Sequence, residues 1–312
     1  MEHKIIVIHF CSPCHTIFEP RQTLMNLPFS RLPMLPDLIP SPEELVRAIE
    51  ARGEKVFSEY SPGRKMCWHR FGSGANVVLL HGDHGSWLHW IRNVEVLSKT
   101  FTLWVPDLAG FGDSDTPPDG FGTREIADAA NSSLSLIIGA DTAVGVCGFS
   151  FGGMIATQLA ALRPNVTRLA TIGVAGHGGA HRLLQPMVQW RGLSPEAEVV
   201  ALRQNLVTLM LTPRSANDDL ALQVHRTSCH GTRYRSRDLS RQGALQDLLR
   251  HLSLPIKFIW GSEDATAIPH TIGANLIHDH RERTLTIVAG AGHWAQFEAS
   301  KQIDELLTRW FS

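Results

Sequence analysis

Short apolar runs alternate with helix-like segments along most of this chain. The apolar runs are continuous, as in strands buried on both faces of a sheet, and they occupy residues 76–80, 101–105, 142–147, 166–174, 254–260 and 283–288. Segments at 122–138, 153–163 and about 295–310 have the spacing of helices. Strands that alternate with helices predict a parallel sheet with right-handed crossovers.

Two further signals open the regular part of the chain. Ser41 stands before Pro42 and two glutamates, and this combination predicts a helix over 41–50 that Ser41 caps. Residues 55–60 and 64–71 then predict an antiparallel hairpin, because the Ser-Pro-Gly at 61–63 between them is typical of a turn.

Two regions depart from the alternating pattern. Prolines at positions 13, 20, 28, 33, 36 and 40 oppose both helices and central strands, so we expect residues 1–40 to be loosely ordered or draped on the domain. Residues 175–250 have no strand pattern but helix-like pieces at 195–211 and 218–225, which predicts a cap. The expected division is an extension at 1–40, a core made of 41–174 and 251–312, and a helical cap at 175–250.

Composition narrows the class of protein. The chain has 312 residues, 43% of them hydrophobic, and a net charge of −1, so the strong basic patch typical of nucleic-acid binding is not expected. No apolar run approaches the roughly 18 residues that span a membrane. The apolar patch at 5–10 is too short for a secretory signal, which favours the cytoplasm. We expect a small-molecule substrate as partner, and homo-oligomerisation stays open.

The cysteines do not predict a disulfide framework or a metal site. There are five, at positions 11, 14, 67, 147 and 229, an odd and scattered set. Cys11 and Cys14 form a Cys-x-x-Cys pair, but no second pair with zinc-like spacing completes it. The glycines and aspartates of residues 106–115 are read as a tight turn rather than a metal loop. We therefore expect no metal and no cofactor.

Residues 148–152 (Gly-Phe-Ser-Phe-Gly) hold the strongest candidate for chemistry. The motif lies between a buried strand and a helix, where a sharp turn exposes the serine hydroxyl and small neighbours let the two elements approach. Ser150 is therefore predicted to be a nucleophile. A serine hydroxyl needs a base to take its proton, and the base needs a third group to hold it.

The base and the acid are expected after later strands of the sheet. Asp264 follows the strand that ends at residue 260, with Glu263 as the alternative acid, and His293 lies on the glycine-rich turn after the strand that ends near 288. For the oxyanion of an acyl-transfer intermediate, the expected donors are the backbone N–H groups of Phe151 and Asp83.

These motifs together resemble the α/β-hydrolase fold family across about residues 55–312. The resemblance rests on His81-Gly82 with Gly85-Ser86, the turn at 107–114, the serine motif, Gly261-x-x-Asp264 and Gly292-His293, in the family's order. It implies an eight-stranded, mostly parallel sheet with helices on both faces, a cap inserted over the site, and the triad Ser150, Asp264 and His293. Serine rather than aspartate at position 150 disfavours epoxide hydrolases and haloalkane dehalogenases.

The stretch after His293 is similar to the histidine loop of the meta-cleavage-product hydrolases, which cleave carbon–carbon bonds. That resemblance implies that Trp294 lines the substrate pocket and that a cap arginine, here Arg226, binds a substrate carboxylate. The subgroup carries asparagine before the nucleophile, where this chain has Phe149. We expect Phe149 to contact the substrate, and an apolar residue there favours esters. Apolar cap residues such as Leu184, Met187, Val188 and Trp190 can either roof an acyl pocket or pack onto the core.

The sequence thus predicts a serine hydrolase that acts on a small, fairly apolar carboxylic ester. Two alternatives stay open. One is carbon–carbon hydrolysis of a dienoic keto acid, and the other is a ligand receptor built on the same scaffold.

Overall fold

The computed structural model describes residues 40–180, 186–234 and 244–312. The predicted extension lies outside them except for Pro40, and so do Cys11, Cys14 and Leu184. None of the helices within these ranges has both the length and the apolar character needed to cross a membrane.

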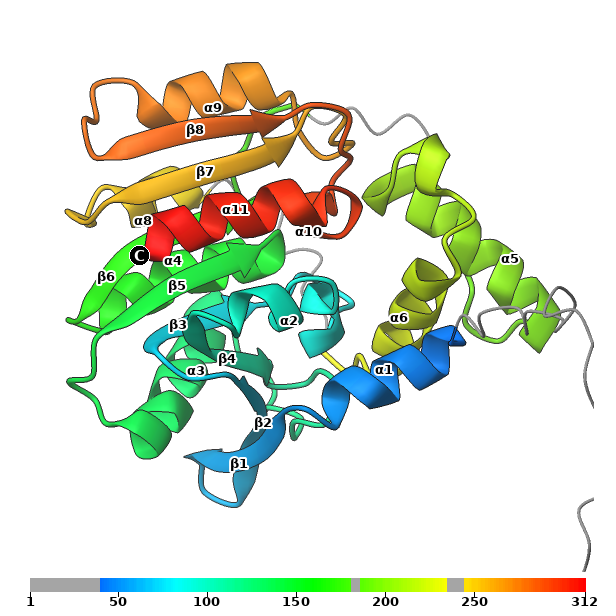
Figure 1. The fold of residues 1–312 in the computed structure, drawn as a ribbon, viewed down its shortest axis with the longest axis horizontal. Coiled ribbons are helices and arrows are strands. Elements are labelled where there is room, and N and C mark those ends of the chain that lie inside the picture. The colour runs from blue at the N-terminus through cyan, green and yellow to red at the C-terminus, as the bar shows by residue number, and fades with distance from the viewer. Residues whose placement is uncertain (1–39, 181–185, 235–243) are drawn as a thin grey trace, which may run out of the picture. The chain divides into compact units, whose positions relative to one another are not determined.

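A single eight-stranded sheet forms the centre of this part of the chain, in the order β1-β2-β4-β3-β5-β6-β7-β8 (Figure 1). The strands are β1 Glu54–Ser61, β2 Arg64–Phe71, β3 Ala75–Leu80, β4 Phe101–Asp107, β5 Val144–Phe149, β6 Val166–Ile172, β7 Ile256–Gly261 and β8 Arg283–Val288. The pairs β1–β2 and β2–β4 are antiparallel and the other neighbours are parallel. The predicted mostly parallel sheet is confirmed.

Helices cover both faces of the sheet, because each strand sends alternate side chains to opposite sides. Val78 and Leu80 of β3 join a hydrophobic cluster on one face, and Val77 and Leu79 join a second cluster on the other. The first cluster includes residues of α3 (Thr123–Ile138), α4 (Phe151–Leu162), α8 (Leu245–Leu249) and α9 (Pro269–Ile277). The second includes residues of α2 (Val94–Leu97) and α11 (Ser300–Phe311).

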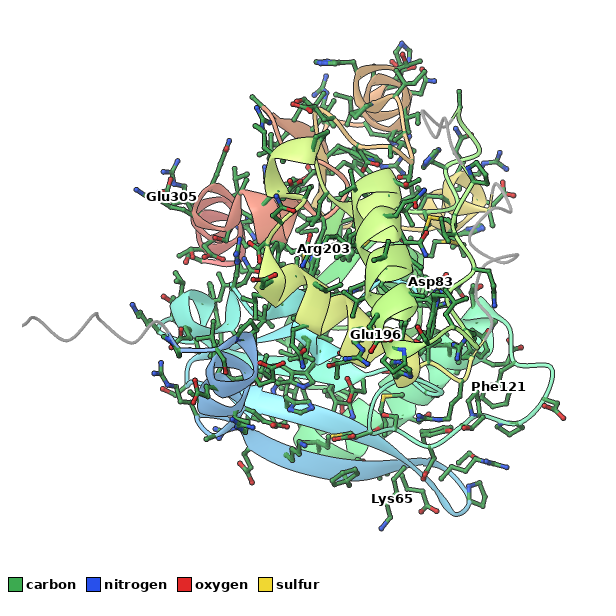
Figure 2. The ribbon with its side chains drawn as sticks, turned by 90° about the vertical axis from the view of Figure 1, so that its right-hand side faces the viewer. Lys65, Asp83, Phe121, Glu196, Arg203 and Glu305 are labelled. Atoms are coloured by element: carbon green, nitrogen blue, oxygen red, sulfur yellow. The ribbon has the colours of Figure 1, made fainter. Side chains whose placement is uncertain are left out.

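The predicted cap region contains helices and no strand within its described residues. Its main helices are α5 (Pro195–Asn205) and α6 (Asp219–His230), joined through a π-helical turn η2 (Leu206–Met210) and the short η3 (Pro213–Ser215). Figure 1 shows them on the side toward which β7 and β8 point, and Figure 2 faces that side, with Glu196 and Arg203 marking α5. The helix α8 packs against α4 instead, so the predicted boundary at residue 250 includes a helix of the core.

Several element boundaries differ from those that the sequence predicts. The helix α1 (Pro42–Glu50) begins as expected, with Ser41 and Glu44 forming a capping box. The strand β5 continues through Phe149, which pairs with Ile172, so Ser150 follows the strand directly. The last helix is two helices, α10 (Ala295–Glu298) and α11, with Ala299 between them. The pattern also missed the helical turn η1 (Trp87–Trp90) and α2.

Candidate active site

Ser150 occupies a strained turn between β5 and α4. Its backbone has φ 52° and ψ −116°, a conformation that a residue with a side chain rarely adopts. A Cβ on Gly148 would lie 2.1 Å from the Gly152 carbonyl oxygen, and a Cβ on Gly152 would lie 2.3 Å from the His81 oxygen. The two flanking glycines are therefore needed for strand, turn and helix to pack this closely.

A chain of hydrogen bonds links Ser150 to His293 and Asp264. His293 Nε2 lies 3.0 Å from Ser150 Oγ, and His293 Nδ1 lies 2.9 Å from Asp264 Oδ2. Burial raises the pKa of the Asp264 carboxyl, but His293 and Thr266 outweigh burial, so the net shift is downward and the group is a carboxylate at neutral pH. The sequence-predicted nucleophile, base and acid are thus brought together, whereas Glu263, the alternative acid, pairs with Arg214 near the surface.

Thr266 is a member of this site that the sequence reasoning missed. Its backbone N–H and its hydroxyl both donate to Asp264 Oδ1, at 2.7 and 2.8 Å. Aspartate commonly accepts from the N–H two residues ahead, so the order Asp-x-Thr was the available signal. Thr266 leaves Oδ2 of Asp264 for His293, which fixes the orientation of the carboxylate.

The loop after β3 is held from behind by His89, a second residue that sequence reasoning missed. The Gly82 N–H donates to His89 Nδ1 at 3.2 Å, which places the proton of the ring on Nε2. Burial holds the pKa of His89 well below its usual value, so the ring is neutral and keeps this acceptor. His81 Nε2 accepts from the Leu108 N–H at 3.0 Å and ties the same loop to the end of β4.

The predicted oxyanion donors belong to two separate segments, the loop after β3 and the first turn of α4. Asp83 borders the cavity in front of the nucleophile, and its carboxylate accepts from the His84 N–H at 2.8 Å. Phe151 is the first residue of α4, so its N–H lies at the positive end of that helix while its ring is fully buried. Gly82, the neighbour of Asp83, has its N–H engaged by His89.

A cavity of about 650 Å³ opens at Ser150 and His293. Its apolar lining includes Phe149, Met187, Val188, Trp190, Leu209 and Met210. Its polar lining includes Asp83, His84, Arg191, Asn205, His225, Cys229 and Thr266. Burial lowers the pKa of His225 to about 4 and raises that of Cys229 to about 12, so the wall contributed by α6 is uncharged at neutral pH.

Two sequence-predicted substrate contacts do not reach this cavity. Trp294 is 0% exposed, donates its indole N–H to the His89 carbonyl at 3.0 Å and stacks on Phe297, because the backbone after His293 turns the indole into the core. Arg226 pairs with Glu198 on the neighbouring cap helix, at 2.8 Å. Phe149, the third predicted contact, does line the cavity, and its ring lies 4.9 Å from that of His293.

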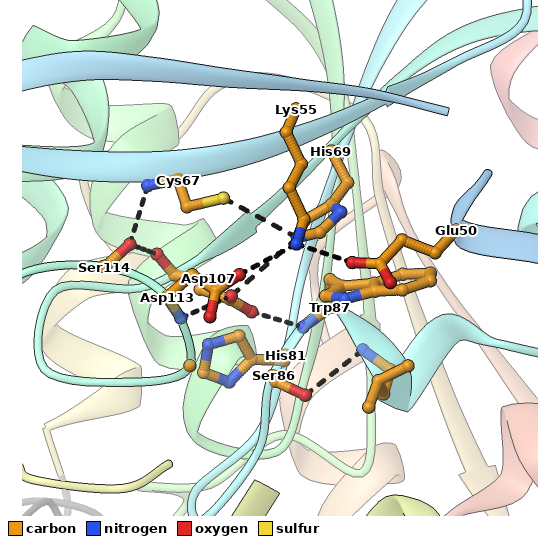
Figure 3. A network of polar contacts seen from close by, with 12 residues as sticks. Glu50, Lys55, Cys67, His69, His81, Ser86, Trp87, Asp107, Asp113 and Ser114 are labelled. Atoms are coloured by element: carbon orange, nitrogen blue, oxygen red, sulfur yellow. Dashed lines mark hydrogen bonds and ion pairs between the residues drawn. The ribbon is translucent and has the colours of Figure 1, made fainter. Parts of the chain in front are cut away.

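Among the described residues, Cys67, His69, Asp107 and Asp113 form a group with side chains of the types that bind metals, which we call the Asp107 cluster (Figure 3). Their candidate ligand atoms lie within 4.8 Å of one another. The carboxylates of the cluster already accept hydrogen bonds from other groups of the protein. Asp107 accepts from the N–H groups of Trp87 and Asp113, and Asp113 accepts from the Lys55 ammonium at 3.0 Å (Figure 3). Burial raises the pKa of Cys67 to about 12, so its thiol stays protonated.

Comparison with known proteins finds partial sequence matches to two kinds of hydrolase. A soluble epoxide hydrolase of Corynebacterium sp. (strain C12) is 40% identical over 98 residues, which cover 31% of this chain and 34% of that protein. A pimeloyl-[acyl-carrier protein] methyl ester esterase of Vibrio campbellii is 34% identical over 129 residues, 41% of this chain and 46% of the esterase. The chain thus matches less than half the length of these two relatives.

Solved structures show the same fold. The A129V mutant of CumD, a meta-cleavage product hydrolase of Pseudomonas fluorescens IP01, superposes with a TM-score of 0.66 at 21% identity, covering 83% of this chain and 97% of CumD. The model of the alpha/beta hydrolase family matches residues 77–306, well over half of the sequence. The chain belongs to the alpha/beta hydrolase family.

Proposed function

We propose that this hydrolase is a serine esterase that cleaves a small, fairly apolar carboxylic ester through an acyl-enzyme. The observation that carries the proposal is the unbroken hydrogen-bond chain from Asp264 through His293 to Ser150, with Ser150 at the border of the cavity. The apolar lining and the neutral wall of α6 fit an uncharged acyl group better than an ionic one.

Each group has a defined task in this mechanism. Ser150 Oγ attacks the ester carbonyl while His293 Nε2 takes its proton, and the developing oxyanion accepts hydrogen bonds from the N–H groups of Asp83 and Phe151. His293 then returns the proton to the departing alcohol. Water, deprotonated by His293, then attacks the acyl-enzyme, and His293 returns this proton to Ser150 Oγ as the carboxylic acid leaves. Asp264 holds the Nδ1 proton and stabilises the charged imidazolium in both steps.

The proposal is tested with p-nitrophenyl esters of graded chain length and one ring-fission keto acid. Ser150→Ala is expected to lower kcat by about 10⁶, because the three residues act as a unit. Ser132→Ala removes an exposed serine hydroxyl from α3 and is the matched control, with kcat unchanged. Ester turnover by Ser150→Ala at the wild-type rate contradicts the proposal. A single turnover that ends in a stable adduct would instead support the receptor alternative.

Carbon–carbon hydrolysis stays a second candidate because Arg191 lines the cavity. Its guanidinium stacks on Trp190 at 4.4 Å and donates to the carbonyl groups of Cys229 and Thr232 at the end of α6. If a keto acid is the substrate, Arg191→Gln lowers turnover of that acid and spares neutral esters. Equal losses on both kinds of substrate would remove this candidate.

A further inference from the structure

The loop that carries His293 is in contact with the cap on both sides of the histidine. We call residues 289–294 the His loop and residues 210–214, which join α5 to α6, the cap turn. On one side the backbone N–H of Trp294 donates to the Met210 carbonyl at 2.8 Å. On the other side the Arg214 guanidinium donates to the Gly290 carbonyl at 2.5 Å. The position of the imidazole is therefore tied to the position of the cap turn.

Glu298 joins the two segments most directly. One oxygen of its carboxylate, Oε2, accepts from the Gly292 N–H at 2.7 Å. The other oxygen, Oε1, accepts from the N–H and the hydroxyl of Thr212, at 2.9 and 2.7 Å. The residue itself lies at the end of α10, the helix that follows the His loop. One carboxylate thus binds the residue before His293 and the middle of the cap turn at once.

The fit around Gly292 leaves little room for adjustment. A Cβ on Gly292 would lie 2.9 Å from Glu298 Oε2 and 3.1 Å from both the Met210 carbonyl oxygen and the Thr212 nitrogen. The cap turn, the carboxylate and the His loop are therefore packed against one another, and a shift of the cap turn is transmitted to the residue next to His293.

We propose that Glu298 is a positioning residue, which holds His293 Nε2 in reach of Ser150 only while the cap turn is seated on the His loop. The inference rests on the proposed esterase function. Hydrogen bonds to a carboxylate are among the stronger ones, and here a single side chain supplies the acceptors for two segments. A displacement of about 1 Å in a catalytic group can cost about 10² in rate. Loss of this link lowers kcat more than it changes KM.

The test compares Glu298→Gln with Glu305→Gln, a control on the exposed face of α11, where Glu305 faces Arg309. Glutamine keeps the shape of Glu298 but offers one acceptor oxygen, so one of the two segments loses its acceptor. We expect kcat to fall about 10- to 100-fold with KM within about twofold, and Glu305→Gln to match wild type. Thr212→Val removes one donor to Glu298 and is expected to lower kcat less than Glu298→Gln does. In the double variant the two losses of kcat are expected not to add.

A second readout does not depend on turnover. The proton between His293 Nδ1 and Asp264 gives a low-field ¹H NMR signal when the pair is ordered, and we expect this signal in wild type and its broadening or loss in folded Glu298→Gln. A folded Glu298→Gln with wild-type kcat and an intact signal overturns the proposal. If wild type hydrolyses no ester, the esterase function fails. A signal that is present in wild type and lost in Glu298→Gln then still supports the positioning role. Absence of the signal from wild type overturns the positioning role as well.

Discussion

The candidate active site and the Asp107 cluster contain the same kinds of side chain but differ in how their hydrogen-bonding capacity is used. Each has a buried histidine beside a buried aspartate whose pKa is lowered. In the candidate active site, His293 binds Asp264 through one ring nitrogen and reaches Ser150 at the cavity through the other. In the cluster, His69 Nε2 lies between Cys67 Sγ and Asp107, at 3.7 and 3.8 Å.

The surroundings explain why only one of the two groups fits a catalytic role. The Trp87 ring stacks on the His69 ring at 4.5 Å, and none of the Asp107 cluster borders the cavity. The carboxylate of Asp107 holds the backbone of the turn that follows β4 and of η1. Residue types alone therefore do not identify a site, because a cavity and a ring nitrogen directed at a nucleophile are also required.

The largest difference between the two regions is expected in turnover. Asp264→Asn should lower kcat on the best p-nitrophenyl ester by about 10⁴, because the amide no longer holds His293 in the tautomer that accepts the Ser150 proton. Asp107→Asn, the matched change in the cluster, should leave kcat within about threefold in the folded protein. A loss of similar size in both variants would show that the cluster takes part in the chemistry.

The Asp107 cluster is expected to contribute to stability rather than to turnover. Asp107→Asn should lower the free energy of unfolding by about 2–4 kcal/mol at pH 7, because a buried carboxylate loses its charge while its partners stay in place. The folded pKa of Asp107 is lowered, since His69 and the Asp113 N–H outweigh burial. Its contribution is therefore complete above the unfolded pKa of about 4 and is lost as the pH falls through the lower folded value. Urea unfolding of wild type and Asp107→Asn, at pH 7 and in acid, measures this contribution. A difference in unfolding free energy that grows in acid would contradict the expectation.

Asp304 on α11 is a buried carboxyl group whose pKa is raised, in contrast to Asp107 and Asp264. It accepts from the Asn93 amide at 2.8 Å, and burial raises its pKa to about 7. Between about pH 4 and 7 the folded state binds more protons at this group than the unfolded state, so stability falls as the pH rises through that window. Asp304→Asn should raise the Tm by about 2–4 °C at pH 8 and leave it unchanged at pH 3. Thermal unfolding at both values checks this, and a lower Tm at pH 8 would contradict it.

The smallest effect is expected at the exposed edge of the Asp107 cluster. The Lys55 side chain is 39% exposed, and its ammonium bridges Glu50 and Asp113, which are also accessible to solvent. Exposed ion pairs contribute about 0.2–1 kcal/mol, so Lys55→Met should cost no more than that in urea unfolding. A cost equal to that of Asp107→Asn would mean that the cluster depends on its outer charge rather than on its buried hydrogen bonds.

The sequence predicted those parts of the site that depend on local order along the chain. Ser150, Asp264 and His293 each follow a strand whose apolar run is visible in the sequence, and the carboxyl ends of parallel strands meet at one edge of a sheet. The glycines beside Ser150 were equally informative, because the turn between β5 and α4 excludes larger side chains.

The sequence could not predict contacts that depend on how distant segments pack. Glu298 and Thr212 meet across 86 positions, and His89 supports Gly82 only because η1 folds back under the loop. The resemblance to the meta-cleavage-product hydrolases implies that Trp294 lines the pocket, but residues that are neighbours in sequence need not face the same way. The backbone N–H of Trp294 donates to the Met210 carbonyl, and its indole lies in the core.

The central claim, that Ser150 is the activated nucleophile, is tested most directly with a p-nitrophenyl alkylphosphonate followed by peptide mass spectrometry. The account predicts one phosphonyl group per chain, on Ser150 Oγ, appearing in step with the loss of esterase activity and absent from Ser150→Ala. Complete inactivation with the label on another residue, or full labelling of Ser150 with activity retained, would contradict it.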